Sequence, residues 1–373
     1  MAPLRMLLAA AISLSVAGVA YGAEEPAGLP TLRMVFFTPA DVEPPAGVQR
    51  RMTQIADYSE RFFVRWMDHW KYQPANKKLF QRNGDGTAEV LFVKGEHRLA
   101  SGRYDEVGFQ QEVIEKAVRQ YKISRNRHLW WIFVYLGDPP RRLKGYRGDG
   151  DSQNGGWAML NYSSVPGEIR PGSDLGEGFN DEFTLKGCIH ELGHAFGLPH
   201  IGPRLRRGLG NSLMGPQTDL FIRQRAPNKQ KVYLTEASAA MLWKHPLFSG
   251  TAKDRAVMPD VQLGDYRATF DRKQRRITVS GKLSSNRPAH SVVIIDDMQK
   301  KPGPYWVRGY VGRPAEDGTF SVAIDEPAPS DGQFKIVFCF QNGAVTGDGK
   351  KHGFGGAIVK SYRFSRGDYR FGS

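Results

Sequence analysis

Three histidines and a glutamate lie close together in the segment from His190 to His200. If this segment is helical, His190 and His194 project from one face a turn apart. Gly197 can then adopt the left-handed backbone that ends a helix, and the returning chain brings His200 to the same point. Three imidazole ligands leave a tetrahedral Zn²⁺ one open position for water. Glu191 stands beside the first ligand, so its carboxylate can take a proton from that water and pass it to a leaving amine.

The complete pattern H-E-x-x-H-x-x-G-x-x-H, followed by Asn211-Ser212-Leu213-Met214-Gly215, resembles the metzincin metallopeptidases. The resemblance implies that the three histidines bind zinc, that Glu191 is the general base, and that Met214 forms the apolar floor under the metal. Some metzincin subfamilies place a tyrosine ligand two residues after the methionine. That position is Pro216 here, so the tyrosine ligand has no candidate in this segment.

We therefore predict a secreted zinc endopeptidase that hydrolyses peptide bonds with a water activated by Glu191. Two other functions stay open. One is a zinc-dependent hydrolase of another amide, in a cell-wall or glycan polymer. The other is a non-catalytic surface-binding protein with a vestigial site, although a purely structural zinc site would gain nothing from the Glu191 carboxylate.

Residues 1–23 have the pattern of a secretory signal peptide. Arg5 precedes an apolar run over residues 6–20, and small residues follow. The run is too short to span a membrane, and no other stretch has the required length. We expect an exported protein without a transmembrane anchor. Its cysteines, Cys188 and Cys339, lie far apart in the sequence and are predicted to be buried free thiols.

The chain of 373 residues carries a net charge of +14. A solvated basic surface is one interpretation. The other is a basic rim around the cleft that attracts acidic substrates, a polyanionic matrix or a cell-surface polymer. Nucleic-acid binding is not expected, because the sequence contains no recognised module for it and predicts export. Two clusters could form the rim, and we expect the second to decide selectivity: Arg141, Arg142, Lys144 and Arg147, and Arg204, Arg206 and Arg207.

The predicted catalytic domain covers residues 24–252. Expected strands at 32–38, 89–93 and 129–135 alternate with expected helices at 48–70 and 109–121, which predicts an α/β or α+β domain with a mixed sheet covered by helices. The metzincin resemblance implies five strands and an active-site helix. Asn180 or Asp181 can cap that helix, Leu185 and Ile189 belong to its buried side, and a further helix is expected at 236–243.

The segment Trp157, Ala158, Met159 and Leu160 is predicted to be a strand. The metzincin resemblance implies that it is the sheet edge that pairs with an extended protein or peptide substrate; an ordinary core strand is the alternative. The preceding loop, residues 149–156, has oxygen ligands at alternating positions that could bind Ca²⁺. It lacks the distal bidentate glutamate of a complete calcium loop, so a simple turn is favoured.

Residues 257–373 follow a different pattern, of period-two strands separated by turn residues. Seven short strands in just over a hundred residues predict an all-β sandwich of immunoglobulin-like type. Such a domain could bind glycan, cell wall or substrate protein, or could only stabilise the catalytic unit. The expected strands are residues 266–270, 276–283, 291–296, 305–311, 319–324, 334–340 and 357–364.

Overall fold

The computed structural model describes residues 29–124, 128–138, 143–151, 155–162, 169, 172–175, 185–216, 231–255, 257–349 and 356–372. The predicted signal peptide lies outside these residues, as do the capping candidates Asn180 and Asp181 and the rim candidates Arg141 and Arg142. No helix in the described ranges is long and apolar enough to cross a membrane.

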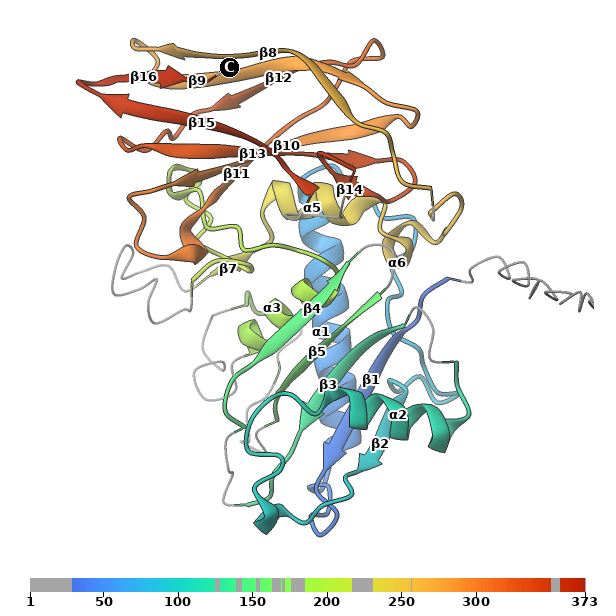
Figure 1. Ribbon diagram of the computed structural model, residues 1–373. Coiled ribbons are helices and arrows are strands. Elements are labelled where there is room, and N and C mark those ends of the chain that lie inside the picture. The colour runs from blue at the N-terminus through green and yellow to red at the C-terminus, as the bar shows by residue number, and fades with distance from the viewer. Residues whose placement is uncertain are drawn as a thin grey trace, which may run out of the picture.

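A mixed five-stranded sheet forms the centre of the N-terminal part, in the order β2-β1-β3-β5-β4 (Figure 1). Strands β1 (Leu32–Thr38), β2 (Val90–Lys94), β3 (Leu129–Val134) and β5 (Gly155–Asn161) run parallel to one another. Strand β4 (Arg147–Asp151) pairs antiparallel with β5. The predicted five-stranded mixed sheet is confirmed.

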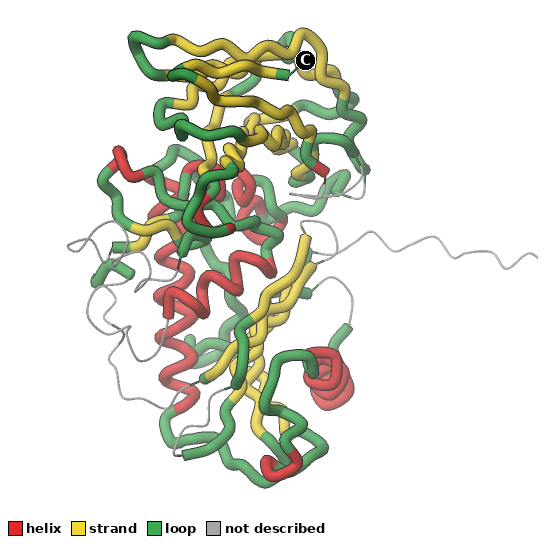
Figure 2. The backbone as a smooth tube through the Cα atoms, turned by 60° about the vertical axis from the view of Figure 1, so that its left-hand side comes forward, coloured by secondary structure: helices red, strands yellow, loops and turns green. Residues whose placement is uncertain are grey.

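Helices cover both faces of this sheet, as Figure 2 shows. Alternate residues of a strand point to opposite faces. Phe36 and Phe133 belong to the buried cluster that contains residues of α1 (Val48–His69) and of α3 (Leu185–Ala195), the helix that holds His190 and His194. Val35 and Ile132 belong to the cluster on the other face, beneath α2 (Gln110–Tyr121). The predicted helices at 48–70 and 109–121 are thus confirmed to within a residue at each end.

The predicted substrate edge is wrong in its position. Trp157 to Leu160 belong to β5, which pairs with β3 on one side and β4 on the other, so its backbone has no free edge. The last strand of the described sheet is β4. Asp149 and Asp151, two of the oxygen ligands in the suggested calcium loop, lie within β4 and pair with β5, so they belong to a hairpin strand instead of an ion-binding loop.

Short elements connect α3 to the C-terminal part: η2 (Leu205–Arg207), β6 (Asn211–Ser212), β7 (Val232–Tyr233), α5 (Glu236–Trp243) and α6 (Pro246–Ser249). Helix α5 begins and ends where the sequence predicts. Its N-cap is Thr235, whose hydroxyl accepts a hydrogen bond from the backbone N–H of Ser238 at 3.1 Å.

Two antiparallel sheets make up the C-terminal part. One buried cluster includes residues of both sheets, such as Val279 and Phe338, so the two sheets share a core. The expected strand at 305–311 begins later, at Arg308, because η3 (Pro304–Trp306) precedes it and starts at a proline, which favours the first position of a helix. The larger sheet contains β10 (Ala289–Met298), β11 (Arg308–Gly312), β13 (Gly332–Phe340), β14 (Val345–Thr346), β15 (Ile358–Ser365) and β16 (Asp368–Phe371), and the smaller β8 (Gln262–Asp271), β9 (Arg276–Ser284) and β12 (Thr319–Ile324).

The core of the N-terminal part continues into the larger C-terminal sheet. Val293, Ile295 and Cys339 belong to the same buried cluster as Cys188 on α3, and Figure 1 shows α5 between the N-terminal sheet and the C-terminal sheets. Both cysteines are buried and free, as predicted. The two parts are therefore joined by apolar packing as well as by the chain.

Candidate metal centre

The three histidines converge at the C-terminal end of α3. The Nε2 atom of His194 lies 3.1 Å from Nε2 of His190 and 3.0 Å from Nε2 of His200. His190 and His194 are one turn apart on the helix, which ends at Ala195. Gly197 has a φ of 86°, the left-handed conformation that the sequence predicts for the reversal toward His200.

Backbone carbonyls fix the orientation of two of these rings. The Nδ1 atom of His190 lies 2.8 Å from the carbonyl oxygen of Leu213, and Nδ1 of His194 lies 2.8 Å from that of Leu198. An Nδ1–H that donates to a carbonyl leaves the lone pair on Nε2, the tautomer that metal-binding histidines use. Burial lowers the pKa of His190 and of His194, which favours the neutral ring that can bind a metal.

The donor set fits zinc. Ligand nitrogens about 2.0–2.1 Å from a tetrahedral zinc ion lie roughly 3.4 Å apart, close to the spacing around His194 Nε2. Within the described ranges, His190, His194 and His200 form the only group of three or more histidine, cysteine or acidic side chains able to hold a metal ion.

Glu191 lies where the edge of the sheet meets the helix. Its pKa is raised to about 7 by burial, while a hydrogen bond from the backbone N–H of Gly148 on β4 acts in the opposite direction. A Cβ atom at Gly148 would come within 2.3 Å of the Glu191 carbonyl oxygen. At Gly150 and Gly156 it would approach the Ala195 carbonyl oxygen to 2.2 and 2.3 Å. Glycine therefore lets β4 and β5 approach α3 closely enough to contact the glutamate.

The methionine predicted to lie under the metal is packed against the middle of α3. Met214 is fully buried, and a Cβ atom at Gly193 would lie 2.5 Å from its sulfur. The buried Lys186 of α3 donates to the carbonyl oxygens of Gly215 and Pro216 at 3.1 and 2.8 Å. Lys186 thus attaches the methionine turn to the helix, a role that no local sequence pattern indicates.

A tyrosine from the C-terminal part lies against the histidines. The ring centroid of Tyr305 is 4.1 Å from that of His200 and 6.0 Å from that of His190. The segment after His200 is bound to the same loop, because the N–H of Gly202 donates to the carbonyl of Val307 at 2.6 Å. The sequence does not point to Tyr305, since no local pattern connects it with residues about a hundred positions earlier.

The arginine-rich insert does not form a free rim. The guanidinium of Arg204 binds the carboxylate of Asp325 and lies 4.6 Å from the centre of the Tyr310 ring. Arg206 donates to the Asp325 carbonyl oxygen at 2.7 Å, and the Arg207 guanidinium lies 5.7 Å from the Trp70 ring centroid. The prediction that Arg204 belongs to a basic rim around the cleft is therefore wrong, because its charge is paired with Asp325 of the C-terminal part.

The fold and the site together define a mixed α/β protein with two additional antiparallel sheets and a histidine triad that could hold a metal. No model of a known protein family matches the sequence, and no curated protein matches it. Solved structures of OgpA from Akkermansia muciniphila are similar in fold. Two are crystal forms of the wild-type protein, with 19% identity and a TM-score of 0.66, covering 92% of this chain and 95% or 96% of the other. The third is catalytically inactive OgpA in complex with an O-glycopeptide (glycodrosocin) substrate, also 19% identical, with a TM-score of 0.65 and coverage of 92% and 96%.

Proposed function

We propose that the protein is an exported zinc metallo-endopeptidase of metzincin type. The observation that carries the proposal is the convergence of three histidine Nε2 atoms on the helix that also holds the half-buried Glu191. The fully buried Met214 beneath α3 and the antiparallel strand β4 next to Glu191 support it. The signal-peptide pattern at residues 1–23 supports export.

The chemistry divides between the metal and the chain. Zinc held by three imidazoles supplies Lewis acidity, which polarises a carbonyl and lowers the pKa of water to about 7. Glu191 accepts a proton from the attacking water and returns it to the amine as the peptide bond breaks. The N–H of Gly148 orients the Glu191 carboxylate. The carbonyls of Leu213 and Leu198 hold two of the imidazoles in the ligand tautomer.

The substrate class we propose is an O-glycosylated peptide. OgpA, which has the same fold over nearly the whole of both chains, was crystallised with an O-glycopeptide substrate. Because β4 is the last strand of the described sheet and contacts Glu191, an extended peptide can add to it as a further strand. The revised edge, Arg147–Asp151, takes the place of Trp157 to Leu160 in this role.

A comparison of the wild type with Glu191→Ala tests the proposal. We expect the variant to bind zinc as the wild type does and to lose cleavage by about 10²–10⁴-fold, the usual contribution of a general base. His200→Ala should instead lower the zinc content, measured by atomic absorption. Undiminished cleavage by Glu191→Ala would refute the mechanism.

The substrate panel needs three members: an O-glycosylated peptide, the same peptide without its glycan, and a cell-wall polymer. Cleavage of the glycosylated peptide alone supports the proposed substrate class. Equal cleavage of both peptides supports a peptidase without glycan selectivity. Products from the polymer alone would overturn the peptidase proposal in favour of another amide hydrolase.

A further inference from the structure

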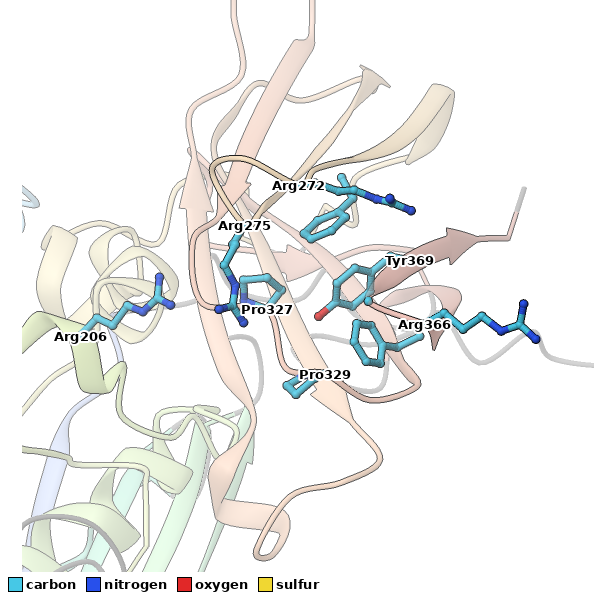
Figure 3. A pocket seen from close by; sticks show the side chains of 10 residues that line it. Arg206, Arg272, Arg275, Pro327, Pro329, Arg366 and Tyr369 are labelled. Carbon is cyan, nitrogen blue, oxygen red and sulfur yellow. The ribbon is translucent and has the colours of Figure 1, made fainter.

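A hollow on the C-terminal part is lined by none of the three histidines (Figure 3). Its volume is about 300 Å³. The β8–β9 turn contributes Arg272 and Arg275, the β15–β16 turn contributes Arg366, and Pro327 lies in the connection between β12 and β13. Arg206 of the N-terminal part completes the lining, so the hollow lies at the junction of the two parts.

The lining is strongly cationic. Four of its side chains are arginines and none is acidic. Arg272 forms an ion pair with Asp368 at 2.5 Å, whereas no ion pair within 4 Å involves Arg206 or Arg275 among the described residues. In Figure 3 the guanidinium groups of Arg206 and Arg275 point toward one another beside Pro327, while Arg272 and Arg366 extend outward. The Arg206 guanidinium also donates to the Asp325 carbonyl oxygen at 2.7 Å. Two like charges that line one hollow and form no ion pair favour an anion in that space.

The backbone at two of these arginines is unusual. Arg275 and Arg366 both have a φ of 50°, in the left-handed region that disfavours residues with a Cβ atom. Glycine or asparagine is the ordinary choice at such hairpin positions. Backbone of this kind persists where the surrounding structure holds it in place, and both of these arginines line the same hollow.

The remaining wall of the hollow is apolar. The Phe270 and Phe364 rings lie 4.7 and 4.9 Å, centroid to centroid, from the buried ring of Tyr369. The Tyr369 hydroxyl already donates to the Ala328 carbonyl at 2.6 Å, so this wall offers ring surface without a free hydroxyl. Phe270 and Phe364 are both half-buried, which leaves part of each ring accessible. A ligand for this hollow therefore combines an anionic group with an apolar face.

We propose that the hollow binds an acidic sugar, a pyranose ring that carries a carboxylate or a sulfate ester. Guanidinium groups bind both anions through paired hydrogen bonds, and the C–H face of a pyranose is apolar enough to lie on aromatic rings. A volume of about 300 Å³ is at the small end of ligand sites, which suits one monosaccharide unit. The inference rests on the proposed function, because it makes the hollow a second subsite for an acidic residue of the substrate's glycan.

Binding is best measured by calorimetry on the full-length Glu191→Ala protein, which keeps the hollow and cannot consume a substrate. The probes are sialyllactose, lactose, 6-sulfo-N-acetylglucosamine, N-acetylglucosamine and inorganic sulfate. We expect at least one acidic sugar to bind at least tenfold more tightly than its neutral counterpart and than inorganic sulfate. If only sialyllactose binds, the anionic group that the hollow recognises is a carboxylate. If only the sulfated sugar binds, it is a sulfate ester.

The double variant Arg206→Gln/Arg275→Gln should weaken binding of that sugar at least tenfold and still unfold in one cooperative transition, although it loses the hydrogen bond from Arg206 to the Asp325 carbonyl. The matched control is Arg370→Gln, an exposed arginine of β16 that does not line the hollow, and it should bind as the parent does. Equal binding of acidic and neutral sugars, equal binding of inorganic sulfate, or full binding by the double variant would each overturn the inference. Because the measurement does not depend on peptide cleavage, a failure of the proposed peptidase activity is seen separately in the cleavage assay.

Discussion

Removal of the Tyr305 ring should weaken zinc binding although Tyr305 is far in sequence from the predicted ligands. His190 and His194 each have a backbone carbonyl at Nδ1. Among the described residues, no hydrogen bond of this kind reaches Nδ1 of His200. The contact beside that ring is Tyr305, at 4.1 Å between centroids. We therefore expect Tyr305 to orient the His200 ring, the third proposed ligand, by ring packing.

The magnitude follows from that contact. An aromatic pair contributes about 0.5–1.5 kcal/mol beyond the area that it buries, equivalent to a change of roughly 2–13-fold in a binding constant. Loss of a residue that orients a metal ligand typically costs 10–100-fold in metal affinity. For Tyr305→Ala we expect a zinc affinity about tenfold below that of the wild type. Tyr305→Phe keeps the ring and should stay within about twofold.

The assay is competition for zinc between the protein and a chromophoric chelator, together with the visible spectrum of the cobalt-substituted protein, which reports ligand geometry without activity. Tyr266→Ala is the control, because Tyr266 packs against the buried cluster shared by the two C-terminal sheets, away from the histidines. Wild-type zinc affinity in Tyr305→Ala would refute the reasoning. An equal loss in Tyr305→Phe would show that the hydroxyl acts instead of the ring.

Three further changes test other contacts. Gly193→Ala should displace Met214, because the new Cβ would lie 2.5 Å from the sulfur. Chemical denaturation should show that the free energy of unfolding falls by about 1–3 kcal/mol. An unchanged free energy of unfolding would mean that the methionine turn can move without cost. Asp325→Asn should weaken the contact between the two parts by about 1–2 kcal/mol. This value is below that of a fully buried ion pair because the Asp325 side chain is 40% exposed, while its partner Arg204 is only 11% exposed. Limited proteolysis near residue 204 should become faster, and an unaltered rate would contradict the prediction. Burial raises the pKa of Asp296 to about 6, so the folded protein resists ionisation of this carboxyl as the pH rises. The wild type should therefore lose up to about 3 kcal/mol of stability relative to Asp296→Asn between pH 4 and pH 7. A stability difference that does not change with pH would contradict the raised pKa.

The convergence of the three histidines could be predicted because it is local. A helix fixes the spacing of His190 and His194, a left-handed glycine fixes the return to His200, and neither depends on distant residues. The sheet edge could not be predicted in the same way. The apolar run at 157–160 signals a strand but not which neighbours it has. The true edge, Arg147–Asp151, contains glycine and aspartate, which are depleted in strands.

That weak strand signal has a physical origin in the site itself. Gly148 and Gly150 on β4 lie so close to α3 that any side chain there would collide with helix carbonyls. The close approach of β4 to Glu191 therefore requires glycine, and glycine is also the residue that makes β4 hard to predict as a strand from its sequence. Sequence patterns are least informative here because the backbone itself approaches the site.

The C-terminal part also contributes more to the metal centre than a separate domain would. The chain between His200 and Met214 is bound to it through Gly202 and Arg204, and Tyr305 rests on the His200 ring. If the position of His200 depends on these contacts, metal binding and docking of the C-terminal part are thermodynamically linked, because a ligand that binds the docked state preferentially must stabilise it. Zinc should then protect the junction between the two parts from proteolysis, and Asp325→Asn should lower zinc affinity although Asp325 contacts no ligand.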